Sequence, residues 1–268
     1  MHAVLTEVVA SAIDRARLSL RSLDAWAQHA VANPNVSDAI VCLTTTPTRL
    51  PRLGATLASV FAQRTRPRAV EIYVPTWSAT ESRGYDLPEW LLALPLVHVV
   101  RCHDMGPATK LLVALKRHAP DTRLLVIDDH TRLPTTLLEE LTTWSDEMQN
   151  AIVGGRGACV RDDDHSASTV LGTQVRAPRR VDIVHGTGGY LVKPRFFDAR
   201  VHDLAKAPPA VRAVDDVWFS AHASVPKWVV PLSRRVFPRP SQGNGAAAST
   251  HEEAHAARRH FAHRWSRS

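Results

Sequence analysis

Cysteine is scarce in this sequence, and the cysteines that occur are far apart. Cys42, Cys102 and Cys159 are the only three in 268 residues. Their separation excludes a CxxC metal-binding knuckle and a disulfide framework, and it favours a reducing compartment. No run approaches the roughly 20 consecutive apolar residues of a transmembrane helix, and we find no internal repeat. We therefore expect a cytoplasmic protein.

Negative charge is also scarce relative to positive charge. The chain has 33 Lys and Arg against 26 Asp and Glu, for a net charge of +7, and it is 44% hydrophobic and 22% charged. These values exclude an acidic disordered chain and are typical of a globular protein. A surplus of this size does not indicate nucleic-acid binding, and we expect no such partner. The length corresponds to one large domain or two small ones.

The hydrophobic pattern predicts helices that alternate with strands. Apolar residues at helical spacing over residues 1–34 predict an amphipathic helical arm, which ends at the Asn33-Pro34-Asn35 break. Beyond it, the pattern predicts strands near residues 39–45, 70–75, 97–101, 123–127, 151–153 and 181–184, and helices near residues 53–61, 109–118 and 137–144. This alternation indicates an α/β fold with a mostly parallel sheet flanked by helices. Such sheets bind ligands at the carboxyl ends of their strands.

Asp128-Asp129-His130 directly follows the apolar strand predicted at 123–127. A carboxylate and an imidazole on either side of one spacer residue can bind the same divalent cation. Such a cation would neutralise a diphosphate. The alternative is a solvated turn at the strand end, since Asp is common in turns.

Four other segments around this motif have residues suited to ligand binding: TTTPTR at 44–49, DMGPATKL at 104–111, GTGGY at 186–190 and VDDVWF at 214–219. The second opens a helix whose first amides, with Lys110, can bind an anion, although a lysine there is often only solvated. The glycines allow a close backbone approach to a ligand, or simply mark a turn. Asp215 and Asp216 are candidates for a general base and its partner.

In this order, TTTPTRL, DMGPATKL, VIDDH, GTGGYLV and DDVWFS resemble the motifs of bacterial-type glycosyltransferases of the GT-A fold, over about residues 39–231. The resemblance implies a GT-A-like (Rossmann-like) α/β catalytic domain over 35–240, preceded by the arm and followed by a basic, His/Arg-rich tail helix over 241–268. It also implies a hexosyl- or N-acetylhexosaminyl-transferase for polysaccharide biosynthesis. Such an enzyme moves a sugar from a nucleotide-sugar donor, typically a UDP-sugar, to a hydroxyl of a glycan or lipid-linked acceptor.

The same resemblance implies roles for individual residues. Asp216 matches the base of inverting members, and Asp215 a contact to the acceptor or donor sugar. The implied donor-binding residues are Thr44, Pro47 and Arg49 at the nucleotide base, Lys110 near the diphosphate, Asp128 and Asp129 in the DxD motif, and Gly188 and Gly189 under the donor sugar. Trp218, inside the second acidic motif, is a candidate for stacking on an acceptor sugar.

The resemblance further implies a divalent metal, Mn²⁺ or Mg²⁺, held by Asp128 and His130. His130 replaces the usual final acid, and imidazole suits Mn²⁺, as in the DxH form of polypeptide GalNAc-transferases. Such enzymes often recruit a ligand from their C-terminal region, and our candidate is His251. The HEEAH run that begins there satisfies the HExxH zinc-protease signature behind a capping box of Thr250 and Glu253. No acid follows Glu253 as a third ligand, which argues against a protease and leaves a solvated helix as the alternative.

Two other functions stay open. A nucleotidyltransferase of the same fold would typically have a glycine- and arginine-rich loop after the first strand, where this chain has Thr44-Thr45-Thr46-Pro47. A non-catalytic sugar-nucleotide or glycan-binding protein is the other. From Lys227 onward, eight Lys and Arg stand against two Glu, so most of the charge surplus lies at the C-terminal end. This tail would close over the donor diphosphate, lie peripherally on an anionic membrane, or form a solubilising surface helix.

Overall fold

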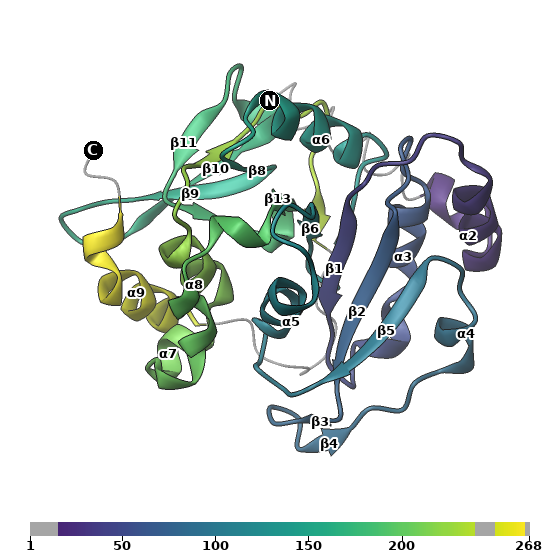
Figure 1. Ribbon diagram of the computed structural model, residues 1–268, viewed down its shortest axis with the longest axis horizontal. Coiled ribbons are helices and arrows are strands. Elements are labelled where there is room, and N and C mark those ends of the chain that lie inside the picture. Colours follow the sequence, from purple (N-terminus) through teal and green to yellow (C-terminus); the bar gives the residue numbers. More distant parts are fainter. Residues whose placement is uncertain (1–15, 239–249, 266–268) are drawn as a thin grey trace.

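The computed structural model describes residues 16–238 and 250–265, and within them a central sheet of eight strands orders the molecule (Figure 1). The strand order is β11-β14-β8-β13-β6-β1-β2-β5. Their bounds are β1 Ile40–Thr44, β2 Ala69–Pro75, β5 Val97–Cys102, β6 Leu124–Val126, β8 Ile152–Gly154, β11 Arg179–Val181, β13 Tyr190–Val192 and β14 Lys227–Val229. All are parallel to β1 except β13 and β11, which run the other way. The predicted mostly parallel α/β sheet is confirmed.

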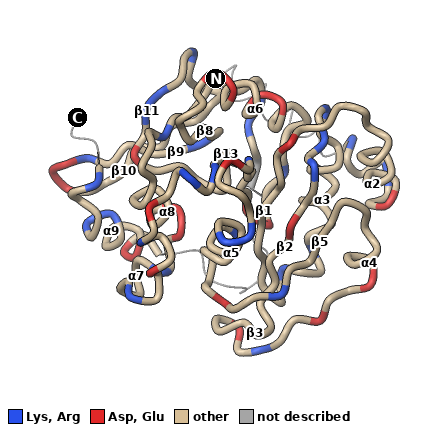
Figure 2. Tube along the Cα trace, viewed as in Figure 1, with Lys and Arg blue, Asp and Glu red and all other residues tan. Residues whose placement is uncertain are grey.

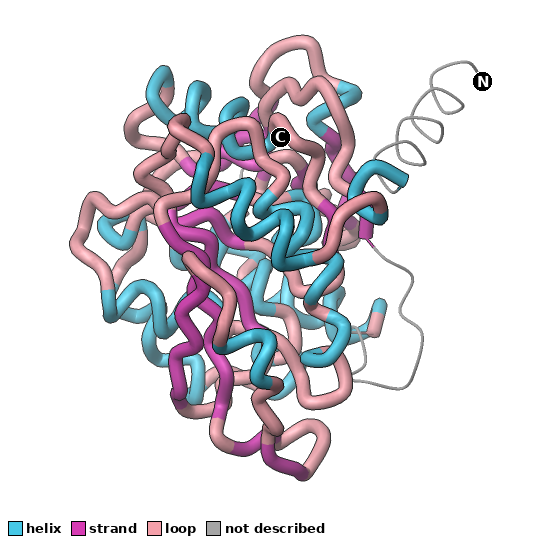
Figure 3. Tube along the Cα trace, turned by 90° about the vertical axis from the view of Figure 1, so that its right-hand side faces the viewer, coloured by secondary structure: helices cyan, strands magenta, loops and turns pink. Residues whose placement is uncertain are grey.

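Helices cover both faces of this sheet, as the view turned by 90° shows (Figure 3). Successive residues of β1 supply the two cores: Ile40 and Cys42 pack with α5 (Thr109–Arg117) and α8 (Asp215–His222), while Val41 and Leu43 pack with α2, α3 and α6. The latter helices span Leu23–Ala32, Gly54–Phe61 and Leu137–Glu147. A strand that is apolar on both faces is what a doubly covered parallel sheet requires.

Smaller elements complete the described chain. A three-stranded sheet has the order β10-β9-β12, from strands Ala167–Leu171, Arg156–Val160 and Ile183–Val184. Short pairs are formed by β3 (Trp77–Ser78) with β4 (Arg83–Gly84) and by β7 (Thr131–Arg132) with β15 (Phe237–Pro238). Two short helices are α4 (Glu89–Leu92) and α7 (Pro209–Arg212), and 3-10 turns lie at Leu50–Arg52, Gly172–Gln174, Gly186–Gly188, Pro194–Phe196, Ala199–Lys206 and Ala262–Arg264. None of the described helices is long and apolar enough to span a bilayer.

The chain ends are placed only in part. Residues 1–15 of the expected arm lie outside the described residues; beyond them, α2 buries Trp26, Ala27 and Ala30 and packs on α3. At the other end, α9 (His251–His260) begins at the predicted Thr250–Glu253 capping box. Residues 241–249 and 266–268 of the expected tail also lie outside the described residues.

The C-terminal helix is a packed element. Ala257, Phe261 and Trp265 belong to the same core as α5 and α8, and Phe261 lies edge-on to Trp218 with ring centroids 5.9 Å apart. Thus α9 covers α8, the helix whose first two residues are Asp215 and Asp216. The expectation of a solvated surface helix holds only for its outer face.

Candidate active site

The candidate site lies where β1 and β6 end. Cys42 pairs with Val126, so the residues that follow, Thr44-Thr45 and Asp128-Asp129, emerge side by side at the carboxyl edge of the sheet. Thr45 confirms this proximity, because its hydroxyl donates a hydrogen bond of 2.7 Å to the carboxylate of Asp129. Parallel strands thus bring together two motifs about 80 residues apart in sequence, as ligand binding at this edge requires.

The side chain of Asp129 binds two residues of the loop after β1, Thr45 and Arg49. Its side chain is only 3% exposed; one oxygen accepts the Thr45 hydroxyl, and the other lies 3.2 Å from both Arg49 Nη1 and His130 Nδ1. Burial opposes its ionisation, but these three partners outweigh burial and lower the carboxyl pKa. The predicted donor-binding carboxylate is therefore occupied by protein groups, and Arg49 is held with it.

Lys110 joins the two acidic motifs. Its ammonium lies 2.6 Å from Asp128 Oδ1 and 2.9 Å from Asp215 Oδ2, and its side chain is 4% exposed. Burial would lower the lysine pKa, yet the charges of Asp128 and Asp215 raise it well above its ordinary value. The solvated alternative for this lysine is wrong: Lys110 is a buried cation at the start of α5, bound to one acid from each motif.

The adjacent carboxylates Asp215 and Asp216 have opposite environments. Burial raises the pKa of Asp215 to about 6, with the charges of Asp216 and Asp128 adding to burial and Lys110 opposing it. Burial also penalises ionised Asp216, but His185, whose Nδ1 lies 3.0 Å from Oδ2, together with the charge of Lys110 and the N–H of Gly186, outweighs burial and lowers the pKa of Asp216. Asp216 is therefore ionised at neutral pH, while Asp215 titrates closer to neutrality.

The glycine segment brings backbone against these acids. A Cβ on Gly186 would lie 2.6 Å from Asp128 Oδ1, and one on Gly188 would lie 2.3 Å from the Cβ of Arg156. Gly189 has φ +68°, which favours glycine. The predicted close approach thus exists, but the atoms approached at 186 belong to the protein's own acidic motif.

The other residues that the sequence predicts for the site differ in their contacts and exposure. Thr44 donates to the Tyr73 carbonyl, and His130 is 32% exposed beside Asp129. Trp218 is 4% exposed and its indole donates to the Val201 carbonyl, so the structure gives it a packing role between α8 and α9 in place of the predicted sugar contact. Pro47 lies in the turn that follows β1.

The predicted metal ligands do not form one cluster. No group of three or more His, Cys, Asp and Glu side chains in the described ranges is arranged to hold a metal ion. His251 is exposed in the first turn of α9, and His255 of the same helix lies 2.7 Å from the Asp164 carbonyl. Asp128 and His130 stand on either side of Asp129 in the sequence, and Asp128 forms its ion pair with Lys110.

Sequence reasoning gave no role to three residues of this cluster: His185, Arg156 and Tyr190, the last of which ends the predicted glycine segment. Tyr190 is 1% exposed, and its hydroxyl has no hydrogen-bond partner within the described part of the chain. Arg156 lies under Gly188, and the charges of Asp216 and Asp128 act on it. His185 could have been found, because it follows the predicted strand 181–184 as Asp128 follows its own strand.

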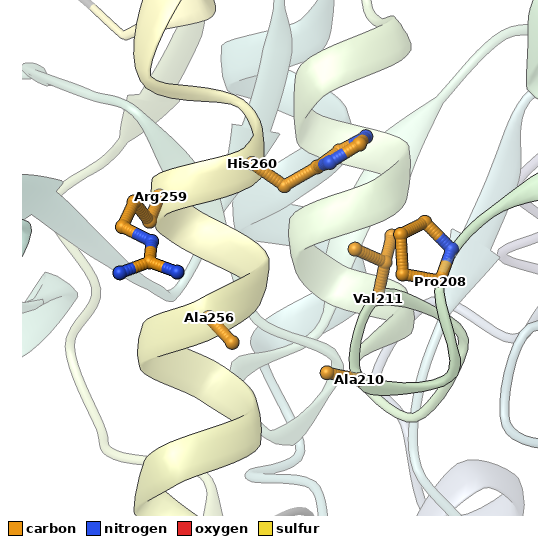
Figure 4. Close-up of a pocket in the computed structure, with 6 residues that line it drawn as sticks. All are labelled: Pro208, Ala210, Val211, Ala256, Arg259 and His260. Carbon is orange, nitrogen blue, oxygen red and sulfur yellow. The ribbon is translucent and has the colours of Figure 1, made fainter.

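A separate shallow groove of about 270 Å³ lies between α7 and α9 (Figure 4). Figure 4 shows Val211 and Ala256 on its opposite walls, with Arg259 and His260 on the α9 side. The acids of the candidate site do not line it.

Comparisons with known proteins agree with this architecture. No protein-family model matches the sequence, and no curated protein sequence matches it. Among solved structures, GalNAc-T7 with UDP, GalNAc and Mn²⁺ is similar over 77% of this chain and 44% of its own, with 14% identity and a TM-score of 0.52. Residues 1–349 of S. aureus TarS in complex with UDP-GlcNAc are similar over 79% and 61%, with 12% identity and a TM-score of 0.50. At these identities the likeness establishes the fold: the chain has the GT-A glycosyltransferase fold. It spans 44% of the length of the first neighbour and 61% of the length of the second.

Proposed function

We propose that the protein is a glycosyltransferase that moves a hexosyl or N-acetylhexosaminyl group from a UDP-sugar to a hydroxyl acceptor. The observation that carries this proposal is the meeting of the two acidic motifs at the carboxyl edge of a GT-A sheet, where the position of Gly186 lies against Asp128 and its N–H donates to Asp216. Both structural neighbours have UDP or a UDP-sugar in their crystals, which supports the choice of donor.

The donor would lie across the loop after β1, the glycine segment and the start of α5. Arg49 and Lys110 supply positive charge there, and the glycine segment supplies backbone without side chains. Asp128 and His130 would hold a Mn²⁺ or Mg²⁺ ion, which when bound neutralises the diphosphate leaving group. His130 suits this role because its Nδ1 faces Asp129, which leaves Nε2 for an ion.

Asp216 would act as the base of an inverting displacement. A base must be ionised before it accepts a proton, and the lowered pKa of Asp216 meets that condition at neutral pH. The acceptor oxygen forms a bond to the anomeric carbon as the bond to the nucleoside diphosphate breaks, and the hydroxyl proton passes to the carboxylate. The acceptor would be a glycan or a lipid-linked glycan in polysaccharide biosynthesis, at the cytoplasmic face of a membrane.

The test measures UDP binding by calorimetry and by the rise in melting temperature that a bound ligand causes. We expect binding with MnCl₂ and little with EDTA, and weaker binding of ADP and GDP. Asp128→Asn should weaken metal-dependent binding at least tenfold, whereas Asp164→Asn, at an exposed turn, is the matched control. An affinity for UDP that is changed neither by metal nor by Asp128→Asn would refute the proposed site.

A non-catalytic sugar-nucleotide-binding protein is the second candidate. It is favoured by the ion pair of Lys110 with Asp128, which occupies a carboxylate that the metal would need. A screen of UDP-hexoses and UDP-N-acetylhexosamines for hydrolysis separates the two functions. Release of UDP from one donor, abolished by Asp216→Asn, supports the transferase, whereas binding of that donor without any release supports the binding protein.

A further inference from the structure

Both carboxylate oxygens of Asp216 are held by the two residues that open the glycine segment. Oδ2 lies 3.0 Å from Nδ1 of His185, and Oδ1 accepts a hydrogen bond of 3.1 Å from the backbone N–H of Gly186. Because a carboxylate only accepts, Nδ1 must carry the proton of the imidazole ring. His185 is therefore a donor at Nδ1, and its orientation relative to Asp216 is fixed.

The backbone contact depends on glycine at 186. A side chain there would meet Asp128 Oδ1 at 2.6 Å, so only glycine allows this N–H to reach Asp216 while Asp128 stays on Lys110. The side-chain contact depends on His185, which is 26% exposed, whereas Asp216 is 17% exposed. The carboxylate of Asp216 is thus partly open to solvent, and its hydrogen bonds come from the first residue of the glycine segment and from His185 just before it.

Within the described parts of the chain, no second side chain hydrogen-bonds Oδ2 of Asp216. The titratable or charged groups that interact with Asp216 come from several elements: His185 before the 3-10 turn Gly186–Gly188, Lys110 on α5, Arg156 on β9, Tyr190 on β13 and Asp215 on α8. Of these, Lys110 is bound to Asp128 and Asp215. His185 is the side chain that hydrogen-bonds Asp216.

We propose that His185 is a positioning residue for the proton transfer, and this rests on the proposed function. Its Nδ1–H fixes Oδ2 while Gly186 fixes Oδ1, so that a free lone pair of the carboxylate faces the acceptor hydroxyl. In the displacement the acceptor O–H bond breaks and its proton goes to Asp216. The oxygen bonds to the anomeric carbon, and the nucleoside diphosphate leaves with the electrons of the broken C–O bond. His185 donates throughout and exchanges no proton.

Three variants at one position separate this role from others. In His185→Asn the amide nitrogen takes the place of Nδ1 and can still donate, in His185→Gln it takes the place of Nε2, and in His185→Phe no donor remains. We expect Phe and Gln to lower kcat about tenfold, the value of one hydrogen bond to a charged group, with KM for the UDP-sugar unchanged. Asn should restore most of kcat. Equal loss in Asn and Phe would overturn the proposal, because a donor at the place of Nδ1 would then not support kcat.

A readout in the free protein distinguishes this inference from the proposed function. Removing the donor should raise the pKa of Asp216, so the acid limb of the kcat/KM profile moves to higher pH in His185→Phe but not in His185→Asn. NMR titration of the Asp216 carboxyl, in the absence of any UDP-sugar, measures the same pKa shift. An unchanged Asp216 pKa in His185→Phe would overturn the positioning role. Absence of transfer by the wild-type protein, with that shift present, would overturn the proposed function alone.

Discussion

Gly186 is the residue at which the acidic motif and the glycine segment meet. An added Cβ would fall 2.6 Å from Asp128 Oδ1 and 3.2 Å from Lys110 Nζ, so one methyl group must displace the ion pair. We expect Gly186→Ala to lower the free energy of unfolding by about 1–3 kcal/mol, the usual cost of overpacking, and to weaken UDP binding.

Gly54→Ala is the matched control for that substitution. Gly54 begins α3, and its added Cβ would meet only Leu23 Cδ2, at 3.6 Å. Alanine is the better helix former, so we expect a gain of roughly 0.5–1 kcal/mol. Urea denaturation of both variants checks the pair, and equal midpoints would contradict the clash at 186.

The raised pKa of Asp215 makes the stability of the protein depend on pH. Its pKa is raised from an ordinary value of 3.8 to about 6, so between these pH values the folded protein keeps a proton that the unfolded chain has lost. The contribution of Asp215 is therefore fully present below pH 3.8 and is lost as pH rises through about 6. Asp215→Asn should gain stability on the wild type by roughly 2–3 kcal/mol over this range, with a plateau above it.

Chemical denaturation at intervals from pH 4 to pH 8 measures this difference. Loss of stability in Asp215→Asn at pH 7 would show that its ion pair with Lys110 outweighs burial and the neighbouring carboxylates. The same substitution at Asp86, which is exposed, should change the free energy of unfolding by less than about 0.5 kcal/mol across this range.

At the scale of elements, α9 stabilises the helix that presents the acids. Phe261 is 5% exposed and contacts the rings of Trp218 and His222 of α8. Phe261→Ala should cost about 3–5 kcal/mol, as for other buried aromatic truncations. His263→Ala, two residues later and exposed, should change stability by less than about 0.5 kcal/mol. Similar unfolding curves for the two variants would show that α9 is peripheral.

The elements that sequence reasoning found are those with local signals. The strand over 123–127 is recognisable because its apolar run ends in acids, and α5 because Gly106-Pro107 precedes its apolar face. The strands β13 and β14 were missed. Their place in the sheet depends on pairing with β8 and β6, which lie far away in sequence.

The candidate site shows the same limit. Asp128, Lys110 and Asp215 were each identified by residue type and position, but not their joining, because contact between residues 110 and 215 is a property of the fold. Trp218 was misplaced because its motif suggested a site contact, whereas α9, far along the chain, buries it. Periodicity reports which face of an element is buried and not what buries it.

At the scale of the whole molecule, positive charge is spread along the trace and includes α9 (Figure 2). Contact with an anionic membrane is one of the three roles that the sequence leaves open for the C-terminal end, and it can be tested. Arg259 is exposed on α9. One Lys or Arg near an anionic surface contributes about 1 kcal/mol to binding, so Arg259→Glu should weaken binding to phosphatidylserine vesicles, measured by co-sedimentation, by about fivefold or more.

Arg68→Glu, at an exposed position before β2, changes the net charge equally and is the control. Equal effects of the two variants would show that net charge, and not α9, governs the association. Deleting α9 is not a substitute for this test, because the deletion would expose Trp218 and His222 and alter stability as well.

The bridge made by Lys110 has an evolutionary consequence. A buried ammonium between two carboxylates is tolerable only while those charges compensate it, and each carboxylate in turn relies on the ammonium. Loss of Lys110 would leave two buried carboxylates without their counter-charge, whereas loss of one acid would leave a matched pair. Substitutions should therefore be coupled in one direction: homologous chains that lose the lysine should also lose the acids, and replacement of the lysine alone should be rare among functional descendants.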